Sequence, residues 1–411
     1  MFSSARSVRS RSALLGAAVA AALACSVGTA PAALADDMRS KQWYLDAMDA
    51  DAMWKVSTGK GITVAVLDSG VRSEPELAGR VLEGRDFTGS GGSGKDSDGH
   101  GTDMAVTISG SGASGGVKGL APDAKILSVR VAVKDHEFGG MHRLAEAIRY
   151  TADTDARVIN ISRAGDYPGV KEKQELASAV DYALSKGKLI FAGSGNGGDK
   201  GNPVEYPAAT PGVVAVGSVG TDGKLSKFSS TGSHVGLAAP GDKIPAHCSD
   251  GNGYCEARGT SYATALTSAT AALIWSAHPG WTGNQVLRVM METAGHNGKV
   301  PSQYIGYGTV RPAQVLLKGN GNPGPADVNP LLAARGAGAG AGTSTTSPSP
   351  ADTADKGAGG GDQEKPQAGK AADSGSEDKD SAPWTVIAII AAAAVLIGGA
   401  FAAVRVRNKR A

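Results

Sequence analysis

Short runs of apolar residues recur along the middle of the chain and alternate with stretches of helical character. Five runs rich in Val, Ile, Leu and Ala lie at 62–67, 126–131, 158–161, 189–192 and 213–216. Helical stretches lie between several of them, as at 140–151 and 171–186. Strands that are apolar on both faces and alternate with helices predict a parallel sheet that is covered on each side. We therefore expect an α/β domain of three layers with a mostly parallel central sheet.

The N-terminal end has the pattern of a targeting segment. It carries three arginines and no acidic residue before position 36, an apolar stretch at 13–24, and small residues that end in Ala-Leu-Ala at 33–35. A basic region, a short apolar region and a small-residue cleavage site together describe a secretory signal peptide. Residues 1–35 are therefore predicted to be removed on export.

The C-terminal end has the pattern of a membrane anchor. Residues 384–404 form a run of 21 residues without a charge, and about 20 apolar residues span the hydrocarbon core of a bilayer. The basic tail, 405–411, follows at once, and basic residues flank the cytoplasmic side of membrane helices. We expect one transmembrane helix in the cell membrane, with the bulk of the chain outside and the C-terminus in the cytoplasm.

Between these ends the composition changes near residue 319. Residues 319–383 consist mainly of Gly, Ala, Ser, Thr, Pro and mixed charges. Such a segment buries too little apolar surface to offset its conformational entropy, so a disordered linker is predicted. This leaves 36–318 as one folded domain.

Net charge and cysteine content narrow the classes of function that fit this chain. The net charge is +2, but three arginines belong to the signal peptide and four basic residues to the tail, so the exported part carries +2 − 7 = −5. That balance offers no basic patch for nucleic acid. Cys25 lies in the signal peptide, which leaves Cys248 and Cys255 as a pair in an oxidising compartment, and we predict a disulfide between them.

Three segments carry candidate chemistry: VAVLDSG at 64–70, DGHGT at 98–102 and GTSYATA at 259–265. Each alone is a weak signal, because an acid after a strand, a histidine between glycines or a serine at a helix start is common. Together they give Asp68, His100 and Ser261 in that order on an α/β pattern. That combination is typical of a serine protease.

With these segments the chain resembles the subtilase family, whose members have the same Asp, His, Ser order. The resemblance covers about 42–317 and includes further blocks such as GLAP at 119–122, YPA at 206–208 and APG at 239–241. With its two ends, the chain resembles membrane-anchored actinobacterial subtilases of the mycosin type. The resemblance implies a subtilisin-like fold and a serine endopeptidase.

The resemblance also implies roles for the candidate residues. Ser261 would attack the substrate carbonyl, His100 would accept and return the proton, and Asp68 would orient the imidazole. Segment 191–197, FAGSGNG, is similar to the family's oxyanion block, so Asn196 would be the oxyanion donor. The alternative is that Asn196 is an ordinary loop residue among glycines. Ser194 and Gly195 in the same block would contact substrate.

Segment 160–165, NISRAG, resembles the family strand that pairs with extended substrate, which assigns substrate contacts to Ser162, Arg163 and Ala164. Arg163 and Ala164 stand where the family usually has an apolar residue and a glycine. Arg163 would either favour acidic substrate side chains or face solvent, and the sequence leaves both open. Asp103 replaces a common second histidine and is interpreted as structural, because negative charge is favourable in a first helical turn.

No metal site or required cofactor is indicated by the sequence. No Cys/His cluster has zinc spacing, and the structural calcium that the resemblance allows has no twelve-residue loop to bind it. We expect protein or peptide substrates, the membrane as a partner through the C-terminal helix, and, by resemblance only, components of a type VII secretion system. The alternative is a protease-like scaffold that binds secretion or envelope partners with little catalysis.

Overall fold

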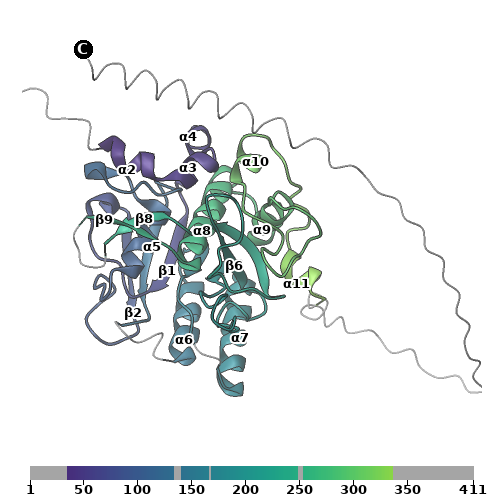
Figure 1. The fold of residues 1–411 in the computed structure, drawn as a ribbon. Coiled ribbons are helices and arrows are strands. Elements are labelled where there is room, and N and C mark those ends of the chain that lie inside the picture. The colour runs from purple at the N-terminus through teal and green to yellow at the C-terminus, as the bar shows by residue number, and fades with distance from the viewer. Residues whose placement is uncertain (1–34, 134–139, 166–167, 249–252, 337–411) are drawn as a thin grey trace, which may run out of the picture. The chain divides into compact units, whose positions relative to one another are not determined.

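The computed structural model describes residues 35–133, 140–165, 168–248 and 253–336. A sheet of seven parallel strands, in the order β2-β3-β1-β4-β5-β6-β7, forms the centre of the domain (Figure 1). Its strands are β1 (Thr63–Asp68), β2 (Val81–Asp86), β3 (Lys125–Arg130), β4 (Val158–Ile161), β5 (Leu189–Gly193), β6 (Val214–Val219) and β7 (Val235–Pro240). The expected parallel α/β sheet is confirmed.

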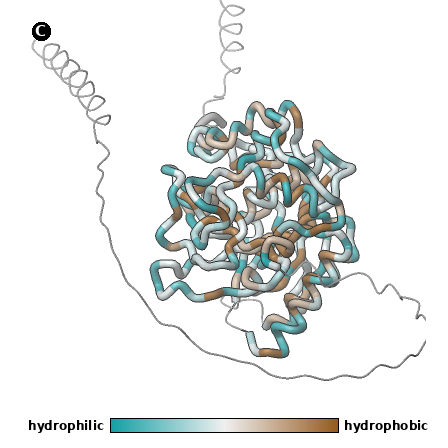
Figure 2. Tube along the Cα trace, turned by 90° about the vertical axis from the view of Figure 1, so that its right-hand side faces the viewer, coloured by the Kyte–Doolittle hydropathy of each residue, from teal (hydrophilic) through white to brown (hydrophobic). Residues whose placement is uncertain are grey.

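Helices cover both faces of this sheet. They are α5 (His100–Ser109), α6 (Met141–Ala152), α7 (Val170–Ser185), α8 (Thr260–Ala277) and α9 (Gly283–Glu292). Successive side chains of a strand face opposite sides. On β1, Val64 and Val66 belong to the hydrophobic cluster of α5, α8 and α9, whereas Ala65 and Leu67 belong to that of α6 and α7. The three expected layers are therefore present, and Figure 2 shows hydrophilic residues along the outer loops and helix surfaces.

Helix α8 runs through the interior, and every residue from Thr260 to Trp275 is buried. Its hydroxyl side chains are accommodated because they donate to the backbone one turn earlier, as Thr264 and Thr267 do to Thr260 and Ala263, both at 2.8 Å. A helix that is packed on all sides and satisfied internally is a rigid support for the residues of its first turn.

The remaining elements lie around the sheet. They are α2 (Ala35–Lys41), α3 (Trp43–Ala47), α4 (Ala50–Met53), the 3-10 helices η2 (Pro75–Leu77) and η3 (Ala113–Gly115), α10 (Pro312–Leu316), α11 (Pro330–Ala334) and the antiparallel hairpin of β8 (Ile244–His247) and β9 (Tyr254–Ala257). The predicted disulfide between Cys248 and Cys255 is confirmed, with Cα atoms 5.0 Å apart, and it joins the two arms of the hairpin.

The five predicted strands are all present, with some ends displaced by a few residues. Strands β2 and β7 were not predicted, for different physical reasons. β2 is an edge strand whose side chains are mostly exposed or half-buried, so it has no apolar run. β7 is fully buried, but its sequence VGLAAP contains Gly, Ala and Pro, which are poor strand formers.

The predicted end of the domain at residue 318 is wrong, because ordered chain continues to 336. Helix α11 begins with Pro330 in its first turn and is capped by Asn329, whose Oδ1 accepts from the backbone N–H groups of Leu331 and Leu332. Leu331 is 1% exposed and packs into the core. The first part of the predicted disordered linker, 319–336, thus belongs to the folded domain.

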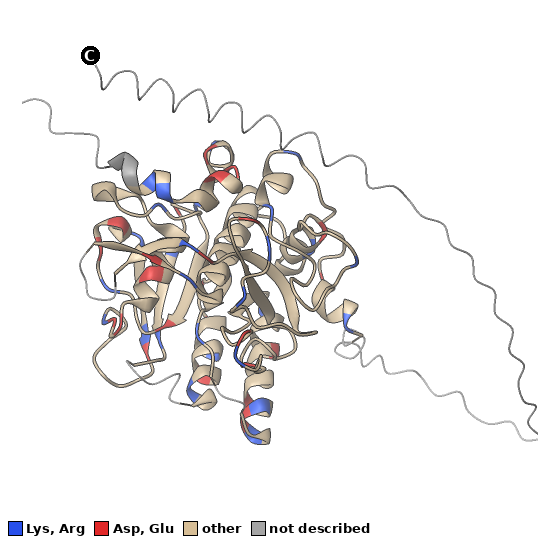
Figure 3. Cartoon of the chain, viewed as in Figure 1, with Lys and Arg blue, Asp and Glu red and all other residues tan. Residues whose placement is uncertain are grey.

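The other predicted segments lie outside the described residues. These are the signal peptide except Ala35, the rest of the linker, the transmembrane helix at 384–404 and the tail at 405–411. Among the helices that the structure describes, none has the length and apolar character needed to cross a membrane. Charges of both signs are interspersed over the described domain, and no extended region of Lys and Arg alone stands out in the view of Figure 3.

Candidate active site

The candidate residues lie beyond the carboxyl ends of the central strands, at the point where the strand order reverses. The chain places β2 and β3 on one side of β1 and β4 to β7 on the other. Ligand sites of open α/β sheets lie at such a switch point. Asp68 is the last residue of β1, Ser162 and Arg163 follow β4, and Asn196 follows β5.

Glycine allows His100 to begin helix α5 next to β1. Gly99, which precedes it, has φ = 85°, a left-handed conformation that other residues adopt with strain. A side chain on Gly101 would place its Cβ 2.1 Å from the carbonyl oxygen of Gly70 and 3.1 Å from Cβ of Asp68. The glycines of the DGHGT segment therefore let the first turn of α5 contact the end of β1.

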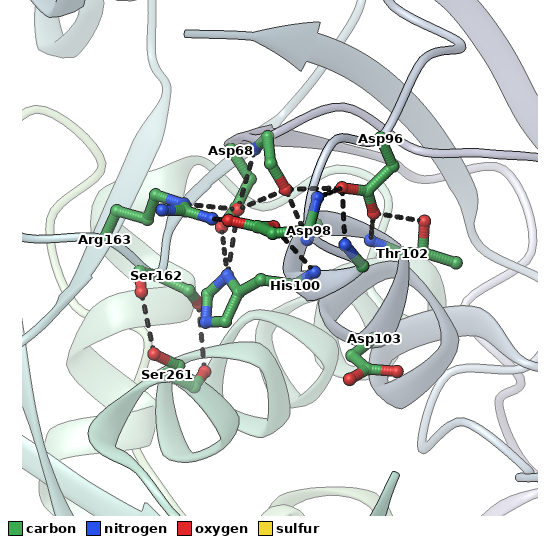
Figure 4. Close-up of polar contacts among 12 residues, drawn as sticks. Asp68, Asp96, Asp98, His100, Thr102, Asp103, Ser162, Arg163 and Ser261 are labelled. Atoms are coloured by element: carbon green, nitrogen blue, oxygen red, sulfur yellow. Dashed lines mark hydrogen bonds and ion pairs between the residues drawn. The ribbon is translucent and has the colours of Figure 1, made fainter. Parts of the chain in front are cut away.

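Asp68 and His100 form a direct pair (Figure 4). The carboxylate is fully buried, and both of its oxygens lie 2.9 Å from Nδ1 of His100. Because an ionised carboxylate only accepts hydrogen bonds, Nδ1 donates and Nε2 is left as the basic nitrogen. Asp68 also accepts from the backbone N–H of Ser69 at 2.8 Å. These contacts fix both the tautomer and the orientation of the ring.

Charge and burial set the proton affinities of this pair. Burial raises the pKa of Asp68, but the positive charges of His100 and Arg163 and their hydrogen bonds outweigh it, so the carboxyl is held well below its usual range. Burial lowers the pKa of His100, while the charge and hydrogen bond of Asp68 raise it, and the net shift is upward. The charge of Arg163 opposes that rise. Asp68 is thus ionised across the neutral range, as an orienting acid must be.

Ser261 lies in the first turn of α8, and Figure 4 shows the His100 ring between Asp68 and this serine. The Ser261 hydroxyl donates to the backbone oxygen of Ser162 at 2.7 Å, and the Ser162 hydroxyl donates to the backbone oxygen of Ser261 at 3.0 Å. The structure therefore brings Ser261 next to His100 but turns its hydroxyl toward Ser162. Rotation of this hydroxyl toward Nε2 would be needed before an attack; such contacts are often loose in substrate-free sites.

The side-chain oxygen of Asn196 points toward the start of α8. Its Oδ1 accepts from the backbone N–H of Thr260 at 2.9 Å and from Oγ1 of Thr260 at 3.1 Å. These bonds direct the Nδ2 donor away from Thr260, and Asn196 is itself exposed. The first N–H groups of a helix have no intrahelical acceptor, so the start of α8 supplies further donors beside this amide. Asn196 is therefore held by Thr260, and its role as oxyanion donor stays a prediction.

Arg163 lies differently from both expectations. Its Nε donates to Oδ1 of Asp68 at 2.8 Å, and its terminal nitrogen pairs with Asp98. The side chain is 16% exposed, so the expectation that it faces solvent is wrong, and its guanidinium is engaged by the site's own acids. The contact follows from the parallel pairing of β4 with β1, which places the residues after β4 beside Asp68.

Asp96 is a residue of the site that sequence reasoning missed. One of its oxygens accepts from the hydroxyl of Ser69 at 2.7 Å, and the other accepts from the N–H of Thr102 at 2.9 Å. The Ser69 hydroxyl in turn accepts from the N–H of Gly101 at 3.0 Å. Asp96 therefore ties the end of β1 to the first turn of α5 and supports the Asp68–His100 geometry.

The other residues predicted to contact substrate are Ser194, Gly195 and Ala164. Ser194 is fully buried, its hydroxyl donates to the backbone oxygen of Ser230 at 2.9 Å, and its backbone N–H donates to the oxygen of Val216 at 2.9 Å. Gly195 has φ = 114°, and a side chain there would meet Glu205. Ala164 is half-buried beside Arg163. The backbone N–H of Ser194 and the backbone oxygen of Gly195 are thus paired within the domain, and substrate contact by these residues stays a prediction.

A cleft of about 960 Å³ adjoins His100 and extends to the β8–β9 hairpin. Asp103 in its wall accepts from Nδ1 of His247 at 3.0 Å, and Nε2 of His247 lies 3.3 Å from the buried Glu76. Hydrogen bonds to Asp103 and Glu76 raise the pKa of His247 to about 9, although burial opposes the rise. The interpretation of Asp103 as a structural residue agrees with these contacts.

Among the described residues one group has the spacing of metal ligands, namely Glu74, Glu76 and His247, whose ligand atoms lie within 4.8 Å of one another. Metal ligation requires a neutral imidazole. Since the pKa of His247 is about 9, this imidazole is protonated at neutral pH. It then acts as the cation of an ion-pair cluster with Asp103 and Glu76.

Comparison with known proteins places this geometry in context. The protein-family model described as "Subtilase family" matches residues 59–308 of the sequence. The chain is 36% identical over 246 residues to the thermostable alkaline protease of Halalkalibacterium halodurans, which covers 60% of this chain and 65% of that protein. It is 32% identical over 327 residues to mycosin-1 of Mycolicibacterium smegmatis, covering 67% of this chain and 72% of that protein. The crystal structure of MycP1 from the ESX-1 type VII secretion system matches with a TM-score of 0.61 and 31% identity, over 70% of this chain and 88% of that one.

Proposed function

Since the chain belongs to the subtilase family of serine proteases, we propose that it is an endopeptidase in which Ser261, His100 and Asp68 carry the reaction. The observation that carries this proposal is the buried Asp68 carboxylate, 2.9 Å from Nδ1 of His100, with the serine on the other side of the ring. A serine hydroxyl needs such a base, because it is a poor nucleophile at neutral pH.

In this mechanism the proton of the Ser261 hydroxyl passes to Nε2 of His100 as Oγ bonds to the substrate carbonyl carbon. The imidazolium then gives that proton to the leaving amine as the C–N bond breaks, and an acyl-enzyme remains. Water repeats the sequence: its proton passes to Nε2, its oxygen bonds to the acyl carbon, and Oγ leaves with the returned proton. Asp68 stabilises the imidazolium in both halves and stays ionised throughout.

Asn196 supports the negative charge that develops on the substrate oxygen. Its Oδ1 is held by Thr260 at 2.9 Å, so its Nδ2 is fixed before substrate arrives. A donor that is already oriented costs no reorganisation in the transition state, and removal of one such donor costs about 3 to 4 kcal/mol of barrier. The start of α8 adds backbone N–H groups in the same region.

The proposed setting is the outer face of the cell membrane. The uncharged run at 384–404 and the basic residues after it support a C-terminal anchor, and the pattern of residues 1–35 supports export. Similarity to mycosin-1 and to a MycP1 structure from a type VII secretion system supports a role beside such a system, with protein substrates.

The second candidate is a protease-like scaffold with little catalysis. Two contacts favour it: the Ser261 hydroxyl donates to Ser162 at 2.7 Å, and Arg163 binds the carboxylate that should serve His100. Rotation of one hydroxyl and a shared carboxylate are, however, compatible with turnover. The endopeptidase therefore remains the proposal. The two candidates differ in the reactivity of Ser261, which can be measured.

The test is labelling of the purified full chain in detergent by a fluorophosphonate probe, which reacts with activated serines. We expect labelling of the wild type and none of Ser261→Ala. Ser276→Ala, in the last part of the same helix, is the matched control and should label normally. A folded wild-type protein that stays unlabelled would support the scaffold, and equal labelling of Ser261→Ala would remove Ser261 from the proposed role.

A further inference from the structure

Arg163 shares the catalytic carboxylate with the catalytic base. Oδ1 of Asp68 lies 2.8 Å from Nε of Arg163 and 2.9 Å from Nδ1 of His100. The guanidinium also pairs with Asp98, whose other oxygen accepts from the backbone N–H of His100 at 3.0 Å. One arginine therefore connects the end of β1, the end of β4 and the start of α5.

The sheet register explains this position. Val66 of β1 pairs with Asn160 of β4, so the chain leaves β4 at Arg163 beside the end of β1. A guanidinium is planar, always charged and able to bind two carboxylates at fixed angles. With 16% of its side chain exposed, Arg163 is buried enough for these charges to interact strongly. Figure 4 shows Arg163 directed at Asp68 and Asp98.

We propose that Arg163 is a positioning residue that withdraws part of the Asp68 charge from His100 and so extends the activity of the protease to lower pH. The proposal rests on the function proposed above. Without Arg163, His100 would be the only cationic partner of Asp68 among these groups, the imidazolium would be more stable, and the base would be protonated at a higher pH. With Arg163, the neutral and catalytically competent imidazole persists further into the acidic range.

The charged and titratable groups around His100 have opposing effects. They are Asp68 on β1, Asp98 before α5, Asp103 on α5, Tyr262 on α8, Arg163 after β4, and Arg72 and Glu74 at the cleft wall. For the pKa of His100, burial is the largest influence and lowers it, Asp68 and Asp98 raise it, and Arg163 lowers it. Removing Arg163 thus takes away the nearest cation and leaves two acids uncompensated.

A purely structural role makes a different prediction. If Arg163 only held the loop after β4 in place, its loss would lower activity or stability at every pH alike. If it acts through His100, its loss moves the pH at which the base gains its proton. The acidic limb of the pH profile of kcat/KM reports the free enzyme's base, and it separates the two roles.

The experiment compares wild type, Arg163→Met and Arg163→Lys as full chains in detergent, by the rate of fluorophosphonate labelling from pH 4.5 to 9. We expect the acidic midpoint of Arg163→Met to rise by about one pH unit, the order expected for loss of a nearby partly buried charge. Arg163→Lys, which keeps the charge, should move less. Arg80→Met is the matched control and should leave the midpoint unchanged. Arg80 lies away from the site, and its Nε donates to the backbone oxygen of Pro122 at 2.6 Å.

Asp98→Asn provides a test of opposite sign. It removes a negative charge that faces His100 but can keep the acceptor for the His100 N–H, so the acidic midpoint should fall. This variant also keeps the proposal testable if Arg163→Met does not fold. An unchanged midpoint in Arg163→Met, or equal shifts of the same sign in Arg163→Met and Asp98→Asn, would overturn the proposal.

A second readout does not need catalysis. In full chains labelled with ¹³C-histidine and carrying Ser261→Ala, the ring signal of His100, identified with His100→Gln, can be titrated by NMR. We expect this signal to titrate at higher pH when Arg163→Met is added. If wild type is not labelled by the probe, the proposed function fails, while this titration still decides the role of Arg163. An unmoved titration would refute it.

Discussion

The cation at His247 makes stability depend on pH in a defined direction. His247, at the end of β8, lies between Asp103 on α5 and the 2% exposed Glu76 on η2. Hydrogen bonds to these carboxylates raise its pKa from 6.5 to about 9. Because the folded pKa is above the unfolded one, the stabilisation is complete below pH 6.5 and is lost as pH rises through about 9.

The size of this effect follows from the same values. A pKa difference of one corresponds to ~1.4 kcal/mol, so a rise from 6.5 to about 9 gives an upper value of about 3 kcal/mol. The side chain of His247 is 15% exposed, so solvent screening reduces this value only modestly. Glutamine is neutral at every pH. Replacement of His247 by glutamine should therefore lower the free energy of unfolding by about 2 to 3 kcal/mol near pH 6 and by much less near pH 9.5.

The assay is urea unfolding of the full chain at a series of pH values, in a Ser261→Ala background that prevents self-digestion. The quantity compared is the difference in free energy of unfolding between this protein and its His247→Gln variant. His278→Gln is a control of opposite sign, because burial lowers the pKa of His278, which stacks on Trp281 with ring centroids 3.9 Å apart. A difference for His247→Gln that stays constant from pH 6 to 9.5 would refute the reasoning.

Two further predictions follow from the proposed function. Asn196→Ala should lower kcat by about 10² to 10³ with little change in KM, because the donor acts mainly in the transition state; steady-state kinetics on a peptide substrate would measure this, and near-normal turnover would exclude Asn196 from the oxyanion site. A chain that stops after residue 383 should appear in the culture medium, whereas the full chain stays in the membrane fraction. Immunoblots of both fractions test this, and retention of the shortened chain in the membrane would contradict the C-terminal anchor.

The parts of the fold that could be predicted from sequence are those with a local signal. Buried parallel strands such as β4 are apolar throughout, and the sequences of α6 and α7 have apolar residues at helical spacing. The edge strand β2 has no such signal, because an edge is held by one neighbour and faces solvent. The segment with Leu331 was missed because its polar, glycine-rich surroundings hide one apolar anchor that packs against distant parts of the chain.

The candidate site divides in the same way. Asp68, His100 and Ser261 each lie in a short motif, because their positions depend on local backbone such as the left-handed Gly99. The contact of Arg163 with Asp68 joins residues 95 positions apart and depends on the register of β4 with β1. No local pattern encodes such a register, so a charged residue in the substrate segment could be interpreted only as a substrate ligand or a solvated side chain.

Arg163 and Asp103, which depart from the family pattern, can be explained together by the charges around His100. The acids Asp68, Asp98 and Asp103 lie around His100, and a fully desolvated set of like charges would be costly. Arg163 pairs with the first two, and protonated His247 pairs with the third. Asp68 and Asp98 therefore share one cation and Asp103 has another, and in our proposal the sharing of Asp68 sets the basicity of His100. Substitutions that leave the three motif residues intact can then change the pH range of the enzyme without changing its chemistry.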